Sequence, residues 1–147
     1  MVLSMQNSTK FKTQNVIHFE DGIYGFETVK EFKLYQEEEN AAIWSLQAAH
    51  SSYPSLIVIN PLLVVPDYRP IISEYDFAKL ENPLEEDLCI LVVAALKKDI
   101  KESVVNLKSP ILIHTQKRLG RQVIMDETDY PVRYPLFFKL HNHSQLQ

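Results

Sequence analysis

Eight prolines divide this chain of 147 residues into short apolar runs, and their spacing limits what the chain can fold into. Proline has no backbone N–H, so it is found at strand starts, edges and turns rather than inside helices or sheets. The runs between the prolines are rich in β-branched and aromatic residues, which is typical of strands. We therefore expect strands at 16–19, 32–35, 43–48, 56–60, 62–65, 88–96, 104–107, 111–115 and 122–125.

Two of these runs predict how their strands are buried. The run 88–96 has no polar alternation, so it is expected to be a central strand that is buried on both faces. In the run 43–48, apolar residues alternate with Ser45 and Gln47, so the face that carries these two residues is expected to contact water.

Only short helices are expected beside these strands. Ser73 can cap a helix, with Asp76 at the capping-box spacing and Pro83 just after the helix end. A second helical turn is expected at 27–31. The predicted fold is therefore mainly β: a small antiparallel β-barrel-like domain with one or two short peripheral helices. We expect one domain at 16–136, between a polar leader at 1–15 and a C-terminal tail at 137–147.

The composition argues against several classes of function. The chain has 15 basic and 19 acidic residues, a net charge of −4, whereas non-specific nucleic-acid binders are usually basic. Its three glycines leave little room for a glycine-rich phosphate cradle, and its single cysteine permits neither an internal disulfide nor a cysteine-rich zinc site. Residues 1–15 are polar, and the longest apolar run is about half a membrane span. We expect a cytoplasmic protein that does not bind membranes.

No catalytic or metal-binding pattern can be assembled from the reactive residues. Cys89 lies in the most apolar run, where burial makes a thiol inert. His141 and His143 have the spacing of two metal ligands, but no third ligand lies nearby in the sequence. No histidine is paired with an acid at a catalytic spacing. We therefore expect no enzyme activity, no cofactor and no bound metal.

Gly22 and Gly25 have the G-x-x-G spacing of loops that hold a nucleic-acid backbone. The neighbouring acids Glu20, Asp21 and Glu27 would repel phosphate. The spacing is therefore interpreted as a turn in which a glycine adopts a positive φ.

Acidic and basic residues are concentrated in different parts of the chain. Six acids and one base lie between Ile71 and Asp87, and this stretch is either a solvated surface or a contact for a basic protein. Seven bases and two acids lie between Lys97 and Arg121. The basic stretch keeps one alternative open, a regulatory β domain that binds RNA directly through turns at 97–121. The residues expected to contact RNA in that case are Lys97, Lys98, Lys117 and Arg118.

Six segments, taken in order along the chain, resemble the FliW family of flagellar assembly factors. Each segment is short, but together they span residues 16–136. They are Ile17–Glu27, Leu46-Gln47, Leu56–Pro61 with Pro66–Tyr68, Val105–Ile113, Arg118–Ile124, and Tyr130 with Arg133 and Pro135.

The resemblance implies a non-enzymatic partner switch. FliW-like proteins bind flagellin and also bind CsrA, an RNA-binding regulator that represses flagellin translation. When flagellin is exported, the freed factor binds CsrA away from its RNA-contacting surface and relieves the repression allosterically. An acidic chain suits a basic RNA-binding partner, and amphipathic flagellin termini suit an apolar groove. The free protein is expected to be a monomer.

The expected contact residues fall into three groups. Asn60, Asp67 and Tyr68 are polar residues set between prolines, where packing alone does not require them. Asn106 and Arg118 match motif positions of the family, where contact and turn-fixing roles both remain open. The candidates for contact with CsrA are Glu74, Asp76, Glu85, Glu86 and Asp87.

Overall fold

The computed structural model describes residues 15–36 and 42–136. The expected C-terminal tail, and all of the expected leader except Asn15, lie outside these residues, as do His141 and His143. The division of the chain into leader, domain and tail therefore stays a prediction. The strands are β1 (Val16–Phe19), β2 (Glu31–Gln36), β3 (Ile43–Ala48), β4 (Ser55–Ile59), β5 (Leu88–Ala95), β6 (Val104–Val105), β7 (Ile111–His114), β8 (Leu119–Gln122) and β9 (Tyr134–Pro135).

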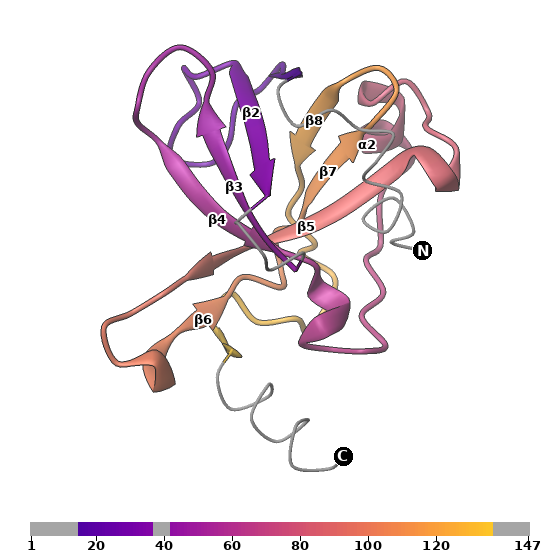
Figure 1. Ribbon diagram of the computed structural model, residues 1–147. Helices are drawn as coiled ribbons and strands as arrows, with labels where there is room; N and C mark the ends of the chain where they lie inside the picture. The colour runs from indigo at the N-terminus through magenta and orange to yellow at the C-terminus, as the bar shows by residue number, and fades with distance from the viewer. Residues whose placement is uncertain (1–14, 37–41, 137–147) are drawn as a thin grey trace.

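Seven of these strands form a closed β-barrel, which confirms the predicted fold class. Strands β1 to β4 form an antiparallel meander, and β4 pairs with β5. The chain then returns through β7 and β8, and β8 closes the barrel against β1 (Figure 1). This last pairing is parallel, whereas the sequence predicts antiparallel strands. Strands β6 and β9 extend the sheet beyond β5.

The parallel seam between β1 and β8 depends on a glycine. Gly120 lies opposite Phe19 in the register, and a Cβ atom at Gly120 would clash with the Phe19 ring. The ring itself is fully buried and makes an edge contact with Phe32, at 5.2 Å between centroids. The missing side chain therefore lets β8 approach β1 closely enough to close the barrel.

Strand β5 separates two hydrophobic clusters. Cys89 and Leu91 point into the barrel, where they pack with residues such as Trp44. Leu88 and Ile90 pack in the second cluster, on the other side of the strand. The prediction of a strand buried on both faces is confirmed, and Cys89 is buried as expected. The second cluster is covered by the segments that follow β4 and β8.

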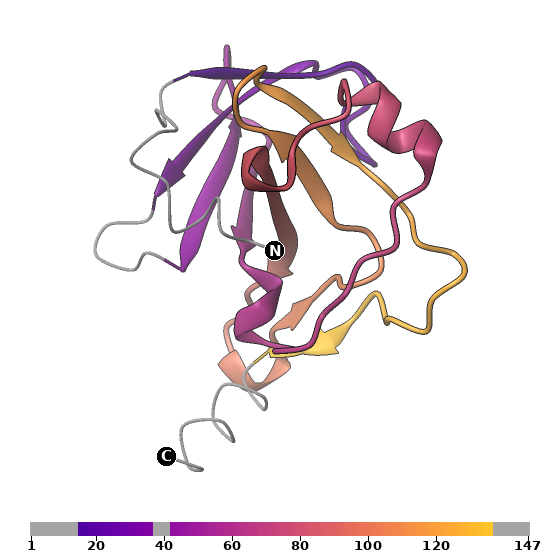
Figure 2. The ribbon, with the colours of Figure 1, turned by 90° about the vertical axis from the view of Figure 1, so that its right-hand side faces the viewer.

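The short helices lie outside the barrel. The α-helix beside the barrel is α2 (Glu74–Lys79), which begins where the capping box at Ser73 predicts. Three 3-10 turns accompany it: η2 (Pro61–Leu63), η3 (Glu85–Asp87) and η4 (Ile100–Glu102). Figures 1 and 2 place α2 and η3 on the same side of the barrel, next to the β7–β8 hairpin.

Two expected strands are wrong. Residues 62–65 form η2 and the turn after it, because Pro61 cannot donate to a sheet and the Asn60 side chain accepts the Leu62 N–H at 3.0 Å. Residues 122–125 are mostly beyond β8, which begins earlier, at Leu119. Arg121 lies in β8, but it is polar, so an apolar run does not include it. Its partner Asp76 is distant in the sequence.

Three smaller expectations also differ from the structure. Residues 27–31 form no helix, because the chain turns back after Gly22 and Gly25 at positive φ and enters β2. The expected strand at 104–107 is reduced to β6. Ser45 is buried rather than wet, since its hydroxyl forms a hydrogen bond with the Ser55 hydroxyl, 3.1 Å away.

Candidate protein-binding surface

Exposed acidic residues lie on α2 and on η3, and we call this set, with the exposed Tyr75 and Leu84, the acidic ridge. Tyr75 and Leu84 are 63% and 64% exposed on it. Among the described residues, none of the ion pairs involves a carboxylate of the ridge. It consists of Glu74, Tyr75, Leu84, Glu85 and Glu86, which are exposed, and Asp87, which is half-buried.

The local sequence explains how the ridge is built. The Ser73 hydroxyl accepts the Asp76 N–H at 3.1 Å and starts α2. Glu81 and Asn82 then adopt positive φ values of 59° and 50°, and both backbone N–H groups donate to carbonyls of the last helical turn. The buried Pro83 directs the chain into η3, so that the acids of η3 lie immediately before the central strand β5.

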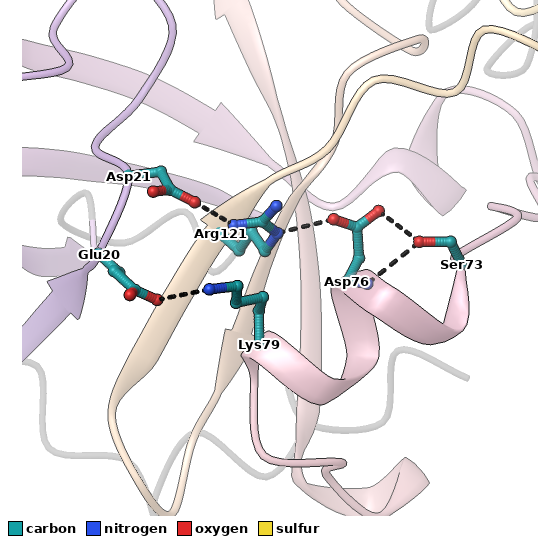
Figure 3. A network of polar contacts seen from close by, with 6 residues as sticks. All are labelled: Glu20, Asp21, Ser73, Asp76, Lys79 and Arg121. Carbon is teal, nitrogen blue, oxygen red and sulfur yellow. Dashed lines mark hydrogen bonds and ion pairs between the residues drawn. The ribbon is translucent and has the colours of Figure 1, made fainter.

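Arg121 holds a second group of carboxylates beside the ridge (Figure 3). Its Nε donates to Asp76 at 2.7 Å, and its guanidinium also pairs with Asp21. The Arg121 side chain is only 16% exposed, and Asp76 is 21% exposed. Arg121 on β8 therefore joins α2 to the loop after β1, and we call Arg121, Asp76 and Asp21 the arginine clamp.

The clamp changes the pKa of Asp21 and of Arg121. The hydrogen bond from Arg121 holds the pKa of Asp21 below its ordinary value. Burial by itself lowers the pKa of Arg121, but the hydrogen bonds to Asp76 and Asp21 outweigh it, so the pKa is raised. Asp21 and Arg121 are therefore both charged near neutral pH. Asp76 also accepts a hydrogen bond from the Ser73 hydroxyl at 2.9 Å, so its carboxylate already has two partners within the chain.

A neighbouring pair and an aromatic ring extend the clamp. Lys79 lies 3.7 Å from Glu20, again between α2 and the loop after β1. Lys79 and Arg121 both lie over the Tyr75 ring, 5.6 and 5.4 Å from its centroid. The exposed Tyr75 is thus held in place where the clamp meets the ridge.

The side chains of Asn60 and Tyr68 have internal hydrogen-bond partners. The Asn60 side chain caps η2, and the Tyr68 hydroxyl donates to the Leu107 carbonyl at 2.7 Å. Tyr68 is only 5% exposed, and burial raises its pKa. Asp67 is exposed, together with Leu63 at 44%. Leu63 and Asp67 are therefore on the surface of the segment that follows β4, whereas Asn60 is half-buried and Tyr68 is buried.

Asn106 and Arg118 both fix turns. The Asn106 side chain accepts the N–H groups of Lys108 and Ser109, each at 3.1 Å. Arg118 has a φ of 56° in the β7–β8 turn, and its carbonyl accepts the His18 N–H at 2.9 Å. The Arg118 side chain is nevertheless exposed.

The basic turns do not form one surface. Lys97 and Lys98 lie on the hairpin after β5, at the opposite end of the barrel from Lys117 and Arg118 (Figure 1). Lys117 is also paired with Glu81 at 3.1 Å. An RNA strand would have to span the barrel to touch both turns, so the alternative of direct RNA binding gains no support from the geometry.

The sequence did not indicate a hollow of about 370 Å³ between the segment that leads into α2 and the segment that follows β8. Ile71 and Ile124 line it and are 62% and 44% exposed. Asp126 and Glu127 lie at the same hollow. The sequence feature that corresponds to this hollow is the apolar run 122–125 followed by Asp126 and Glu127. The same run also has the pattern of a strand, so it does not by itself predict a hollow.

The described part of the chain contains neither a cluster of metal-ligating side chains nor a helix that could span a membrane. Among residues 15–36 and 42–136, no three histidine, cysteine, aspartate or glutamate side chains are placed to hold a metal ion. Within the same part of the chain, none of the helices has the length and apolar character needed to cross a membrane.

The chain was compared with known protein families and proteins. A family model described as "FliW protein" matches residues 4–136. The flagellar assembly factor FliW of Caldicellulosiruptor saccharolyticus is 35% identical over 132 residues, which cover 90% of this chain and 86% of that protein. The protein of the same name from Clostridium tetani is 31% identical over 127 residues, with 86% and 88% covered.

A solved structure agrees with this match. The crystal structure of a flagellar assembly factor FliW has a TM-score of 0.78 and 29% identity to this chain, with 85% of this chain and 87% of the solved chain covered. The family model spans both the closed barrel and the ridge. This chain therefore belongs to the FliW family.

Proposed function

We propose that this chain is a flagellar assembly factor that acts in the cytoplasm as a non-enzymatic partner switch. It binds flagellin while flagellin is plentiful. When flagellin is exported, the freed protein binds CsrA and antagonises it allosterically, which relieves the repression of flagellin translation. The observation that carries this proposal is the match to flagellar assembly factors over nearly the whole chain.

The acidic ridge supports the CsrA half of the proposal. A protein that holds RNA must present basic groups, and exposed carboxylates attract such a partner and speed its association. The carboxylates of Glu74, Glu85 and Glu86 are exposed and have no ion pair among the described residues. Asp76 is less suited to this role, because its carboxylate already binds Arg121 and Ser73.

The segment after β4 supports the flagellin half. Leu63 and Asp67 are among the exposed residues of the stretch that connects β4 to α2 and includes η2. An amphipathic flagellin terminus would place apolar side chains on Leu63 and polar ones near Asp67. Because the two partners exclude each other, the free flagellin concentration relative to its Kd decides how much protein remains for CsrA.

A titration of the purified chain tests both halves. We expect it to bind CsrA and flagellin, with each partner displacing the other, and we expect CsrA binding to weaken as salt rises. It should release labelled RNA from CsrA without shifting that RNA by itself. A chain that binds neither protein, or that shifts the RNA alone, contradicts the proposal.

Charge reversal tests the ridge. Glu85→Lys, Glu86→Lys and Asp87→Lys together should weaken CsrA binding by about tenfold or more without unfolding the domain. The matched control is Glu37→Lys, Glu38→Lys and Glu39→Lys, which changes the net charge by the same amount elsewhere in the chain. Equal loss of binding in both triple variants would mean that net charge, rather than the ridge, attracts CsrA.

A further inference from the structure

We propose that the hollow between Ile71 and Ile124 receives an aliphatic side chain from a lysine- or arginine-rich segment of the basic partner. The inference rests on the proposed function, because it takes CsrA as the protein that carries this segment. It adds a second contact, apolar in character, to the electrostatic contact at the acidic ridge.

The shape of the hollow suits an aliphatic side chain. Its volume is about 370 Å³, and Ile71 and Ile124 come from two separate segments of the chain. Both isoleucines are exposed, although burial of such a side chain away from water is favourable. The buried Met125 also lines the hollow. A partner that covers these residues would remove their apolar surface from water, which favours binding.

The walls of the hollow are already joined in the free protein. The Ile71 N–H donates to the sulfur of Met125 at 3.2 Å, and the Arg69 N–H donates to the Tyr130 hydroxyl at 2.9 Å. The Thr128 hydroxyl donates to the Met125 carbonyl at 3.0 Å and shapes the turn that carries the acids. A partner therefore has little chain to order when it binds, which favours affinity.

The charge around the hollow favours a cationic segment. Asp126 and Glu127 line it, and the exposed Glu74 and Asp129 lie next to lining residues in the sequence. In the part of the chain that the structure describes, no ion pair involves any of these four acids. The nearby Arg121 is already neutralised by the clamp. Lysine or arginine beside the inserted side chain would therefore be attracted, and an acidic segment would be repelled.

The same charges disfavour a second copy of this chain as the occupant. A symmetric dimer would bring the same surface of both molecules together, so the Asp126 and Glu127 side chains of one copy would approach those of the other. Like charges placed opposite each other in an interface cost several kcal/mol. A basic partner has no such repulsion to overcome.

The hollow lies next to the acidic ridge. Ser73 and Asp76 line the hollow, and Glu74 and Tyr75 of the ridge lie between them in the sequence. One partner surface can therefore contact the acids of the ridge and also insert a side chain into the hollow. Salt would weaken the first contact and leave the second largely intact.

Paired serine substitutions test this inference. Ile71→Ser with Ile124→Ser should weaken CsrA binding by about tenfold or more, in physiological and in high salt, because the apolar contact is lost. Leu96→Ser with Ile100→Ser is the control, since these residues are 49% and 48% exposed on the hairpin at the other end of the barrel. The control should bind CsrA within about twofold of the unaltered chain. Denaturant midpoints verify that both variants are folded.

The outcomes separate the inference from the proposed function. If the unaltered chain binds CsrA and the Ile71/Ile124 variant binds it equally well, the inference is overturned and the proposed function stands. If that variant loses flagellin instead of CsrA, or if it dissolves a dimer of the free chain, the hollow has a different occupant and the inference is again overturned. A chain that binds neither CsrA nor flagellin overturns the proposed function itself.

Discussion

The carboxylates of the arginine clamp and those of the acidic ridge lie on neighbouring parts of one surface, but they differ in their partners. Asp21 and Asp76 both bind Arg121, whose side chain is mostly buried. Glu85 and Glu86 are exposed and have no ion pair among the described residues. The fold uses the first group to join α2 to β8 and leaves the second group available to solvent or a partner.

This difference teaches that the number of acids in a stretch does not predict their role. Asp76 and Glu74 are two residues apart at the start of α2, yet Asp76 is committed to the clamp, whereas Glu74 has no ion pair among the described residues. Removing one partner of a half-buried ion pair is costly, because the other charge is left unpaired and poorly solvated, whereas an exposed carboxylate contributes little to stability. Variants should therefore divide cleanly between those that change stability and those that change binding.

Removal of Arg121 should have the largest effect. In Arg121→Met, the carboxylates of Asp76 and Asp21 lose their cationic partner, and Asp76 is left poorly solvated. We expect the free energy of unfolding to fall by about 2–3 kcal/mol in a urea titration. The matched control is Lys117→Met, which breaks the exposed pair with Glu81 and should cost less than about 1 kcal/mol. Equal effects would show that the clamp is no more important than a surface ion pair.

Asp76 and Glu74 provide a second, smaller comparison. Asp76→Asn keeps the side chain's size but loses the charge that Arg121 binds, so we expect a loss of about 1–1.5 kcal/mol. Glu74→Gln has no such partner among the described residues and should change stability by less than about 0.5 kcal/mol. Thermal unfolding of the two variants checks the difference, and a larger effect at Glu74 would contradict it.

The sequence predicts the barrel better than it predicts the surface. The sequence predicts strands such as β3 and β5 correctly, because β-branched and aromatic residues favour the strand conformation locally. The prediction of a strand at 62–65 is wrong, because a short apolar run has the same pattern in a strand and in a partly buried turn.

The contacts that define the site were not visible in the sequence, because they join distant residues. Arg121 lies 45 residues from Asp76 and 100 residues from Asp21, and only the closed barrel brings them together. The hollow likewise joins Ile71 to Ile124. The sequence predicts Asn60 and Asn106 as contact residues, and the structure shows that both side chains hold turns within the chain. A contact with a partner stays a prediction at both positions.

Acid titration should separate the stability contribution of His114 from that of Asp21, because the two are lost at different pH values. Burial lowers the pKa of His114, next to the ridge, below its ordinary value of 6.5. The unfolded chain therefore binds this proton more readily, so stability should be fully present above about pH 6.5 and fall as the pH drops toward the lowered pKa. The contribution of Asp21 persists to lower pH, because it is lost only below the ordinary value of 3.8.

His114→Asn isolates the first of these steps. In the unaltered chain, the Lys117 N–H donates to the Nδ1 atom of His114 at 3.3 Å. Asparagine at this position offers an amide oxygen to the same N–H but does not titrate. The loss of stability just below pH 6.5 should disappear in this variant, and the loss below pH 3.8 should remain. Urea midpoints at several pH values measure both steps. A loss that persists unchanged below pH 6.5 would assign it to a group other than His114.

Neutralisation of the ridge should have the smallest effect on stability and a clear effect on binding. Glu85→Gln with Glu86→Gln removes two exposed charges that have no ion pair among the described residues, so the free energy of unfolding should change by less than about 0.5 kcal/mol. The dependence of CsrA affinity on salt should nevertheless become shallower, because fewer charges are screened. Unfolding and salt titrations of the same sample measure both quantities. If stability fell as it does in Arg121→Met, the ridge would be part of the fold's own ion-pair network, and the contrast with the clamp would be lost.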